Sequence, residues 1–326
     1  MKKVVYAFLL ILLVFAILSF SKDFNLYIPP GFPKPHIPEE NQLTFSRVEL
    51  GRKLFFDKIM SRDSSVSCAT CHVPEFAFTD RLPKAIGIRK QQVNRNAPTL
   101  TNVAYSDKFL LDGVNPSLEA QVMVPIHETN EFDFHVILIA ERMKQNPDYI
   151  RLCKEAYHSE PNPYAITHSI ASFERTLISG NSRYDQFYFQ GDSTALNPSQ
   201  QRGMHLFFNE LYCSSCHGGF NFTKQSLTNN GLYVNYPDSG RIRLTGLEKD
   251  RAVFKVPTLR NIALTYPYMH DGSIQNLEGV IEHYMSGGKA HPNKDPIITP
   301  FDLTEKEKEG LLAFLRSLTD SSFIAQ

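Results

Sequence analysis

Apolar positions recur at intervals of three to four residues along much of this chain, which is typical of helices that bury one face. In residues 46–59, for example, Val48, Leu50, Leu54 and Phe55 follow roughly this spacing. The same pattern predicts further helices over residues 117–126, 133–158 (with a new segment from Pro147), 164–189 and 304–318. Long alternating runs typical of strands are scarce. We therefore predict a mainly α fold.

The N-terminal pattern is different. Lys2 and Lys3 lead into an unbroken run of apolar or small residues from Val4 to Phe20. A short positive start before such a run predicts a signal peptide or an uncleaved membrane anchor over residues 1–22, and hence export to the periplasm. Residues 23–45 are rich in proline and lack periodicity, which predicts an extended arm.

Composition narrows the function classes. The chain has 326 residues, which suits two domains, and 42% of them are hydrophobic, enough for a packed core. Lysine plus arginine and aspartate plus glutamate both number 34. This balance lacks the basic excess of a nucleic-acid-binding protein.

Two stretches of the chain share one plan. Gly51 opens a segment with a Leu-Phe-Phe triplet that leads to the run Ser-Cys-Ala-Thr-Cys-His. Gly203 opens a second such segment, which leads to Cys-Ser-Ser-Cys-His. The repetition predicts a duplicated architecture, with one domain over residues 23–185 and a second over residues 186–326.

The two Cys-x-x-Cys-His runs are typical of covalent c-type haem attachment. Each predicts two thioether links and a histidine ligand to iron; the residues are Cys68, Cys71 and His72, then Cys213, Cys216 and His217. A zinc ribbon would leave the doubled histidine as a coincidence, and a thioredoxin-like pair would need a βαβ setting. Cys153 is left over and is expected to be a buried small hydrophobe.

Taken together, these motifs resemble those of the bacterial di-haem cytochrome c peroxidases and the related MauG enzymes. The similarity extends over about residues 43–319 and is carried by these stretches: LGRKLFFD, SCATCH, RNAPTL, SLEAQ, CSSCH and FKVPTLRNIALTYPYMHDGSIQNLEGVIEHY. The resemblance implies two cytochrome c-like helical domains with one haem each. It also implies that the N-terminal haem meets peroxide and the C-terminal haem passes electrons to it.

The resemblance assigns roles at the peroxide haem. Gln121 and Glu131 match a glutamine and a glutamate of the family over that haem, and Pro125 matches a proline near its open face. A carboxylate there can move a proton between the two peroxide oxygens, and an amide can hold peroxide by a hydrogen bond.

The resemblance also implies a calcium ion between the domains. The matching positions are Asn96 through its side chain, and Thr265 and Pro267 through their carbonyl groups; oxygen ligands suit calcium. His270 matches a family histidine near the C-terminal haem, for which we expect a supporting role or a purely structural one.

Three positions depart from the usual peroxidase pattern. Where many of these peroxidases carry a distal histidine after a glycine, this chain has Ile88, so we expect an open N-terminal haem. The usual methionine ligand of the C-terminal haem falls on Tyr284, as in the MauG type, with Met285 and His283 as neighbouring alternatives. Leu111 stands where a tryptophan usually lies between the haems, and the chain has no tryptophan.

Three functions remain open at this point. The first is a peroxidase that reduces hydrogen peroxide with electrons from a small exported donor, either cytochrome c or a cupredoxin. The second is a MauG-like oxidase that modifies a partner protein, which Ile88 and Tyr284 favour and Leu111 disfavours. The third is a di-haem electron carrier, which Gln121 and Glu131 disfavour. The sequence leaves open whether the chain forms a homodimer.

Overall fold

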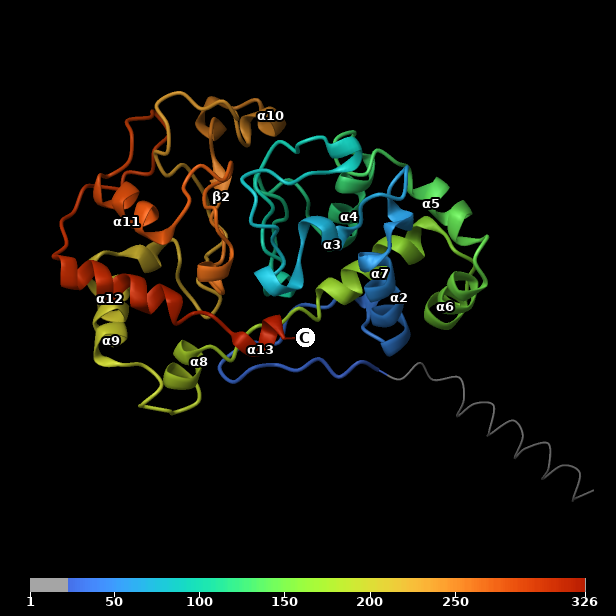
Figure 1. Cartoon of the computed structure of the whole chain (residues 1–326), viewed down its shortest axis with the longest axis horizontal. Helices are drawn as coiled ribbons and strands as arrows, with labels where there is room; N and C mark the ends of the chain where they lie inside the picture. Colours follow the sequence, from blue (N-terminus) through green and yellow to red (C-terminus); the bar gives the residue numbers. More distant parts are fainter. Residues whose placement is uncertain (1–22, 326) are drawn as a thin grey trace, which may run out of the picture.

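The computed structural model describes residues 23–325, and its regular structure is almost entirely helical (Figure 1). The predicted signal or anchor segment of residues 1–22 lies outside the described residues. Within the part that is described, no helix has the length and apolar composition needed to cross a membrane. The prediction of a mainly α fold is confirmed.

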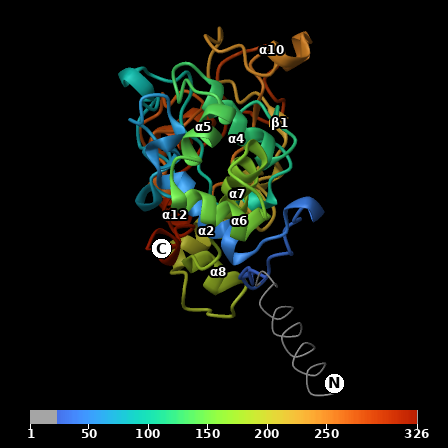
Figure 2. The same cartoon turned by 90° about the vertical axis from the view of Figure 1, so that its right-hand side faces the viewer.

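The helices form two lobes. The first lobe contains α2 (Phe45–Phe56), α3 (Cys68–Cys71), α4 (Leu118–His127), α5 (Val136–Met143), α6 (Pro147–Tyr157) and α7 (Pro163–Glu174). Figure 2 views the molecule from this side, with α2 and α4–α7 in front. The core of this lobe is aliphatic and includes Leu50, Ile139 and Ile166. Cys153 is fully buried in it, as predicted.

The second lobe is built on a different set of elements. It contains α8 (Arg183–Tyr188), α9 (Pro198–His205) continued by a π-helix (Leu206–Glu210), α10 (Ile242–Thr245), α11 (Leu277–Met285) and α12 (Glu305–Arg316), with α13 (Ser321–Ile324) at the chain end and one two-stranded sheet, β1 (Leu227–Thr228) with β2 (Phe254–Lys255). Its core is aromatic, with Phe207, Phe222 and Phe314 at its centre. The predicted domain boundary between residues 185 and 186 falls inside α8 and stays a prediction.

Short 3-10 turns link these elements. They are Glu39–Asn41, Lys58–Met60, Pro74–Phe76, Ile88–Lys90, Val103–Tyr105, Cys213–Ser215, Glu248–Asp250 and Ile262–Leu264.

The shared glycines mark equivalent helix crossings in the two lobes. A Cβ at Gly51 would lie 1.8 Å from the carbonyl oxygen of Ser169 on α7, and a Cβ at Gly203 would lie 1.9 Å from that of Gly310 on α12. No side chain fits at such distances, so glycine is required where α2 crosses α7 and where α9 crosses α12. The duplicated plan therefore has a structural counterpart.

A second repeat is visible in the backbone. Residues 97–126 and 256–285 correspond at a constant separation of 159 residues. Asn102 and Asn261 both adopt a left-handed conformation, with φ of 58° and 59°, and Gly113 and Gly272 do so with φ of 63° and 68°. The two segments end in α4 and α11, which are therefore equivalent helices.

One predicted helix is wrong in its extent. Residues 164–189 form two helices, α7 and α8, separated by residues 175–182. Asp320 near the chain end accepts hydrogen bonds from the backbone N–H groups of Gly180 and Asn181 at 3.0 and 2.9 Å. Gly180 also packs so closely on Pro29 that a Cβ would lie 2.4 Å from its ring. Tertiary contacts thus override the local helical pattern here.

The proline-rich arm of residues 23–45 is mostly extended, as predicted, apart from the turn Glu39–Asn41. Phe32 is buried and contacts the rings of Tyr105, Phe189 and Phe220. The arm therefore packs against side chains from both halves of the chain.

Candidate functional site

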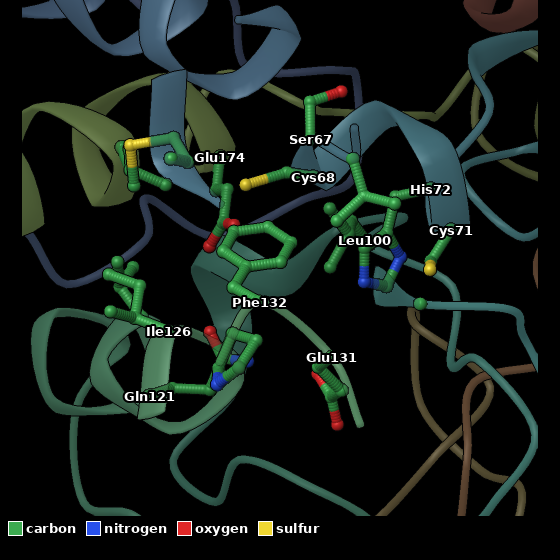
Figure 3. Close-up of a pocket in the computed structure, with 16 residues that line it drawn as sticks. Ser67, Cys68, Cys71, His72, Leu100, Gln121, Ile126, Glu131, Phe132 and Glu174 are labelled. Carbon is green, nitrogen blue, oxygen red and sulfur yellow. The ribbon is translucent and has the colours of Figure 1, made fainter. Parts of the chain in front are cut away.

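A cavity of about 590 Å³, counted with its mouth, opens beside α3 in the first lobe (Figure 3). Apolar side chains form most of its wall, among them Val122, Ile126 and Phe132. The polar groups on the wall are few: Ser67, Cys68, Cys71, His72, Gln121, Glu131 and Glu174.

The first Cys-x-x-Cys-His run forms α3 and the residue that follows it. Cys68 and Cys71 are both free thiols that line the cavity. The Nδ1 atom of His72 lies 2.9 Å from the carbonyl oxygen of Phe78, which fixes the ring and leaves Nε2 for a ligand. Burial lowers the pKa of His72, which favours the neutral, ligating form.

Gln121 and Pro125 lie one turn apart on α4 and both line the cavity. Ser117 caps this helix, since its Oγ accepts a hydrogen bond of 3.1 Å from the N–H of Ala120. The helix is anchored to the first lobe by Glu119, which pairs with Arg175 just after α7. The cap and this ion pair hold Gln121 on the cavity wall.

Glu131 lies on the loop after α4 and also lines the cavity. Its carbonyl oxygen accepts a hydrogen bond of 2.9 Å from the N–H of Ile88, whose side chain is fully buried. Burial raises the pKa of Glu131 to about 7, with a smaller contribution from the charge of Glu128. Such a carboxyl can both accept and release a proton near neutral pH.

Glu174 lines the same cavity, although our sequence analysis did not predict it. It is the last residue of α7 and is only 5% exposed. The only sequence signal was a glutamate in an otherwise apolar stretch next to Arg175. A buried acid at such a position needs a partner or a role.

The second Cys-x-x-Cys-His run lies in the second lobe. Cys213 and Cys216 are free thiols, and the Nδ1 atom of His217 lies 3.2 Å from the carbonyl oxygen of Pro257. Burial lowers the pKa of His217 to about 4, so this imidazole is neutral at physiological pH. The arrangement matches that of His72 in the first lobe.

The three neighbouring candidates for a further ligand on α11 have different surroundings. His283 has its Nε2 atom 3.1 Å from the carbonyl oxygen of Asn230. Met285 packs on the apolar core of the second lobe. Burial raises the pKa of Tyr284 to about 12; the Asn230 side chain opposes this shift, and the charges of Cys213 and Cys216 add to it, which puts the phenol within electrostatic range of both thiols.

The repeat of 159 residues relates Tyr284 to the first site. Pro125 on α4 and Tyr284 on α11 occupy equivalent positions. This internal comparison is a signal that sequence analysis could have used. The choice of Tyr284 over its neighbours stays a prediction.

His270 lies where the two lobes meet. Its ring stacks on Phe254 with centroids 4.1 Å apart, and its carbonyl oxygen accepts a hydrogen bond of 2.9 Å from the N–H of Asn96. Arg95 lies over the ring of Phe254 and pairs with Asp238. His270 is therefore part of the contact between lobes, which fits the expected supporting or structural role.

The predicted calcium ligands lie on the two segments that this same contact joins. The amide of Asn96 donates to the carbonyl oxygen of Leu82 at 2.8 Å, which leaves its Oδ1 atom free to bind a cation. Thr265 and Pro267 lie a few residues before His270 in the segment that Asn96 contacts. Residues 23–325 contain no cluster of three or more His, Cys, Asp or Glu side chains suited to a metal. Calcium stays a prediction.

Both Cys-x-x-Cys-His sites fit a covalent c-type haem. Each offers two free thiols and a neutral histidine whose Nδ1 atom is engaged by a backbone carbonyl. The first also lines a cavity, in which Oε2 of Glu174 has no hydrogen-bond partner among the described residues. The second site is identified by its two thiols and its histidine alone.

Comparisons with known proteins agree with the interpretation that both sites hold a c-type haem. A family model described as di-haem cytochrome c peroxidase matches residues 46–194. The chain is 38% identical over 287 residues to the methylamine utilization protein MauG of Methylorubrum extorquens, which covers 87% of this chain and 81% of that protein. It is 36% identical over 276 residues to the cytochrome c551 peroxidase of Nitrosomonas europaea, which covers 83% of this chain and 79% of that protein.

Solved structures show the same similarity. A crystal structure of a MauG-like protein associated with microbial copper homeostasis superposes with a TM-score of 0.88 at 34% identity, covering 93% of this chain and 97% of that one. The di-haem peroxidase BthA of Burkholderia thailandensis has a TM-score of 0.73 at 19% identity, covering 92% of this chain and 97% of that one, which indicates a shared fold.

Proposed function

Since the chain belongs to the di-haem cytochrome c peroxidase family, which includes the MauG proteins, we propose that it reduces hydrogen peroxide in the cavity beside His72. Membership implies two covalent c-type haems. We propose that the electrons come from a small exported protein, either a cytochrome c or a cupredoxin. The overall reaction takes one peroxide, two electrons and two protons and gives two molecules of water.

The observation that carries this proposal is the placement of Gln121 and Glu131 in one cavity with His72. When bound there, the haem would supply the iron at which the O–O bond of peroxide breaks. The Gln121 amide orients peroxide by a hydrogen bond. The carboxylate of Glu131 takes the proton from one peroxide oxygen and returns it to the other, so that water can leave. Pro125 occupies the wall beside them without offering an iron ligand.

We propose that the second site serves electron entry. His217 and Tyr284 would hold its haem, and the choice of Tyr284 is supported by its lying within electrostatic range of Cys213 and Cys216. His283 and Met285 are engaged elsewhere, by Asn230 and by the apolar core. An anionic oxygen ligand favours ferric iron, whereas a thioether favours ferrous iron.

The second candidate function is a MauG-like oxidation of a partner protein driven by peroxide. It is favoured by Tyr284 and Ile88, and by the 38% identity to the MauG of Methylorubrum extorquens. Against it stand Leu111, which cannot carry charge between the sites as a tryptophan can, and the comparable similarity to a cytochrome c551 peroxidase. A pure electron carrier would not need Gln121 and Glu131 in the cavity.

Several further features belong to this proposal. The two haem domains would extend over residues 23–185 and 186–326, with calcium held between them by Asn96, Thr265 and Pro267. The protein would act in the periplasm, with residues 1–22 as its signal peptide or membrane anchor. Nothing described here decides between a monomer and a homodimer.

The test is steady-state consumption of peroxide by the ferric holoprotein with reduced cytochrome c, without pre-reduction. Rapid oxidation of the donor in a ratio of two electrons per peroxide would support the peroxidase. Peroxide-dependent spectral change of the haems without donor turnover would support the MauG-like oxidase. No reaction of either kind would refute both.

A further inference from the structure

The carboxyl group of Glu174 is enclosed in the wall of the first cavity with unsatisfied hydrogen-bonding capacity. The residue is 5% exposed and lines the cavity. Its Oε2 atom is buried and has no hydrogen-bond partner among residues 23–325. Burying a polar oxygen without a partner costs free energy, so a group retained in this state calls for an explanation.

The neighbouring cation does not neutralise this carboxyl. Arg175 follows Glu174 in the chain, but its Nη1 and Nη2 atoms donate to Oε1 and Oε2 of Glu119 at 2.5 and 3.0 Å. Asn41 donates to the same Glu119 carboxylate at 2.7 Å. Glu119 is thus fully paired, while Glu174 beside it is not.

Without a partner of its own, Glu174 retains its proton. Burial raises the pKa of Glu174 to about 8, because the opposing effect of Arg175 is smaller and Glu119 raises the pKa further. At pH 7 the side chain is therefore mostly a neutral carboxylic acid, which can donate a hydrogen bond or a proton.

Glu174 and Glu131 enter the cavity from different walls. Figure 3 shows Glu174 on the side of Cys68, with Gln121 and Glu131 across the pocket. Burial is the main cause that raises the pKa of the Cys68 thiol, and the charge of Glu174 is the next largest. The charge of Glu131 has a smaller effect. Glu174 therefore lies near Cys68, one of the two attachment points.

We propose that Glu174 is a second proton-holding side chain of this cavity and supplies a proton that the reduction of peroxide consumes. The inference rests on the proposed function. Glu131 only moves a proton from one peroxide oxygen to the other, so it adds none to the balance. The two protons that complete two waters come from outside the substrate, while the donor protein supplies the two electrons. Neutral Glu174 stores one of these protons inside the cavity and regains it from solvent after each turnover.

Glu174 is thus proposed as a proton-storing residue, whereas Gln121 and Glu131 are the groups proposed to contact peroxide. The charges that act on Glu174 are those of Arg175 and Glu119, and Glu174 in turn acts on Cys68. Glu131, which lines the same cavity, has its pKa raised to about 7.

The kinetic test compares Glu174→Gln, Glu174→Asp and Glu155→Gln in the holoprotein. Glutamine keeps the shape but has no proton to give, aspartate keeps the acid, and Glu155 is an exposed acid on α6 that serves as control. We expect Glu174→Gln to lower kcat roughly tenfold at unchanged KM for peroxide, a modest share of what acid–base groups contribute. The wild-type profile should fall as pH rises through about 8, and the variant should lose this limb. Glu174→Asp should recover part of kcat.

A spectroscopic test does not depend on turnover. Infrared spectra of the resting ferric holoprotein at pH 7 should show the C=O stretch of a protonated carboxylic acid, shifted in D2O and absent in Glu174→Gln. Loss of this band above pH 8 should accompany the fall in kcat.

The outcomes are distinguishable. An active wild type with unchanged kcat and pH profile in Glu174→Gln would overturn the role of Glu174 alone, as would an infrared spectrum that shows an ionised Glu174 at pH 7. A wild type that consumes no peroxide would refute the proposed function and this role with it. Equal haem content and circular dichroism in all variants show that they fold alike.

Discussion

The backbone N–H of Ile88 donates a hydrogen bond of 2.9 Å to the carbonyl oxygen of Glu131. By resemblance, position 88 is where many di-haem peroxidases carry a histidine that closes the N-terminal haem. Here the isoleucine side chain is fully buried, and its backbone instead holds the loop that bears Glu131. The segment that closes the site in those peroxidases thus serves to orient the acid in this chain.

Replacing Gly87 with alanine should disturb this arrangement. A Cβ at Gly87 would lie 2.1 Å from the carbonyl oxygen of Asn130, so the loop that carries Glu131 must shift. We expect peroxide turnover to fall at least tenfold, because displacement of a reacting group by about 1 Å can cost a factor of 100. Turnover and haem spectra report the effect. Glu155→Ala, which changes an exposed residue on α6, is the control; equal rates in both variants would contradict this view of the loop.

Glu131→Gln should retain both haems but lose a factor of about 100 or more in peroxide turnover, in line with the usual contribution of acid–base groups. The carboxylate must be ionised to take a proton from peroxide. Because the pKa of Glu131 is raised to about 7, the wild-type rate should rise with pH through that value. The variant should lack this rise. Glu141→Gln, which changes an exposed acid on α5, should behave as wild type.

The ferric holoprotein should show one high-spin and one low-spin haem. Ile88 cannot ligate iron, and Pro125 occupies the position on α4 that Tyr284 holds on α11. Electron paramagnetic resonance of the protein as isolated measures the two populations directly. Two low-spin signals would mean that another side chain closes the first site.

Local signals in the sequence located much of the fold and the site. The Cys-x-x-Cys-His runs determine their own geometry, since the turn brings two thiols and a histidine together. Thr304 begins the predicted helix over residues 304–318, and its side chain accepts a hydrogen bond from the N–H of Glu307 in a capping box. Ser117 likewise caps α4, which holds Gln121 and Pro125. Motifs and caps are short-range features, so a single sequence reveals them.

Features that depend on distant contacts were missed. The break between α7 and α8 is fixed by Asp320, more than 130 residues away, which holds the backbone of Gly180 and Asn181. Glu174 has no motif of its own, and only the structure shows that it faces the same cavity as Glu131. Tyr284 could have been reached by the repeat that relates it to Pro125, but the resemblance had already indicated it.

Removal of the buried ion pair in the second lobe should strongly destabilise the fold. Arg260 and Asp185 are both fully buried and joined by two hydrogen bonds of 2.9 Å. Arg260→Ala leaves an unpaired buried carboxylate, which should lower the free energy of unfolding by about 3–5 kcal/mol. Arg151→Ala, which removes an exposed pair with Glu155, should change it by less than about 1 kcal/mol. Chemical denaturation of both variants measures the difference, and equal stabilities would contradict the prediction.

Tyr284→Phe should alter the spectrum of the low-spin haem and leave the high-spin haem as it is. The phenol lies within electrostatic range of Cys213 and Cys216, whereas Met285 packs into the apolar core of the second lobe. Removing the hydroxyl therefore deletes the proposed ligand with little change in volume. An open iron would lose the low-spin signal, and a newly ligated iron would change it. Met285→Leu is the matched control and should keep the wild-type spectrum. The reverse result would make Met285 the ligand, and a change in neither variant would direct attention to His283.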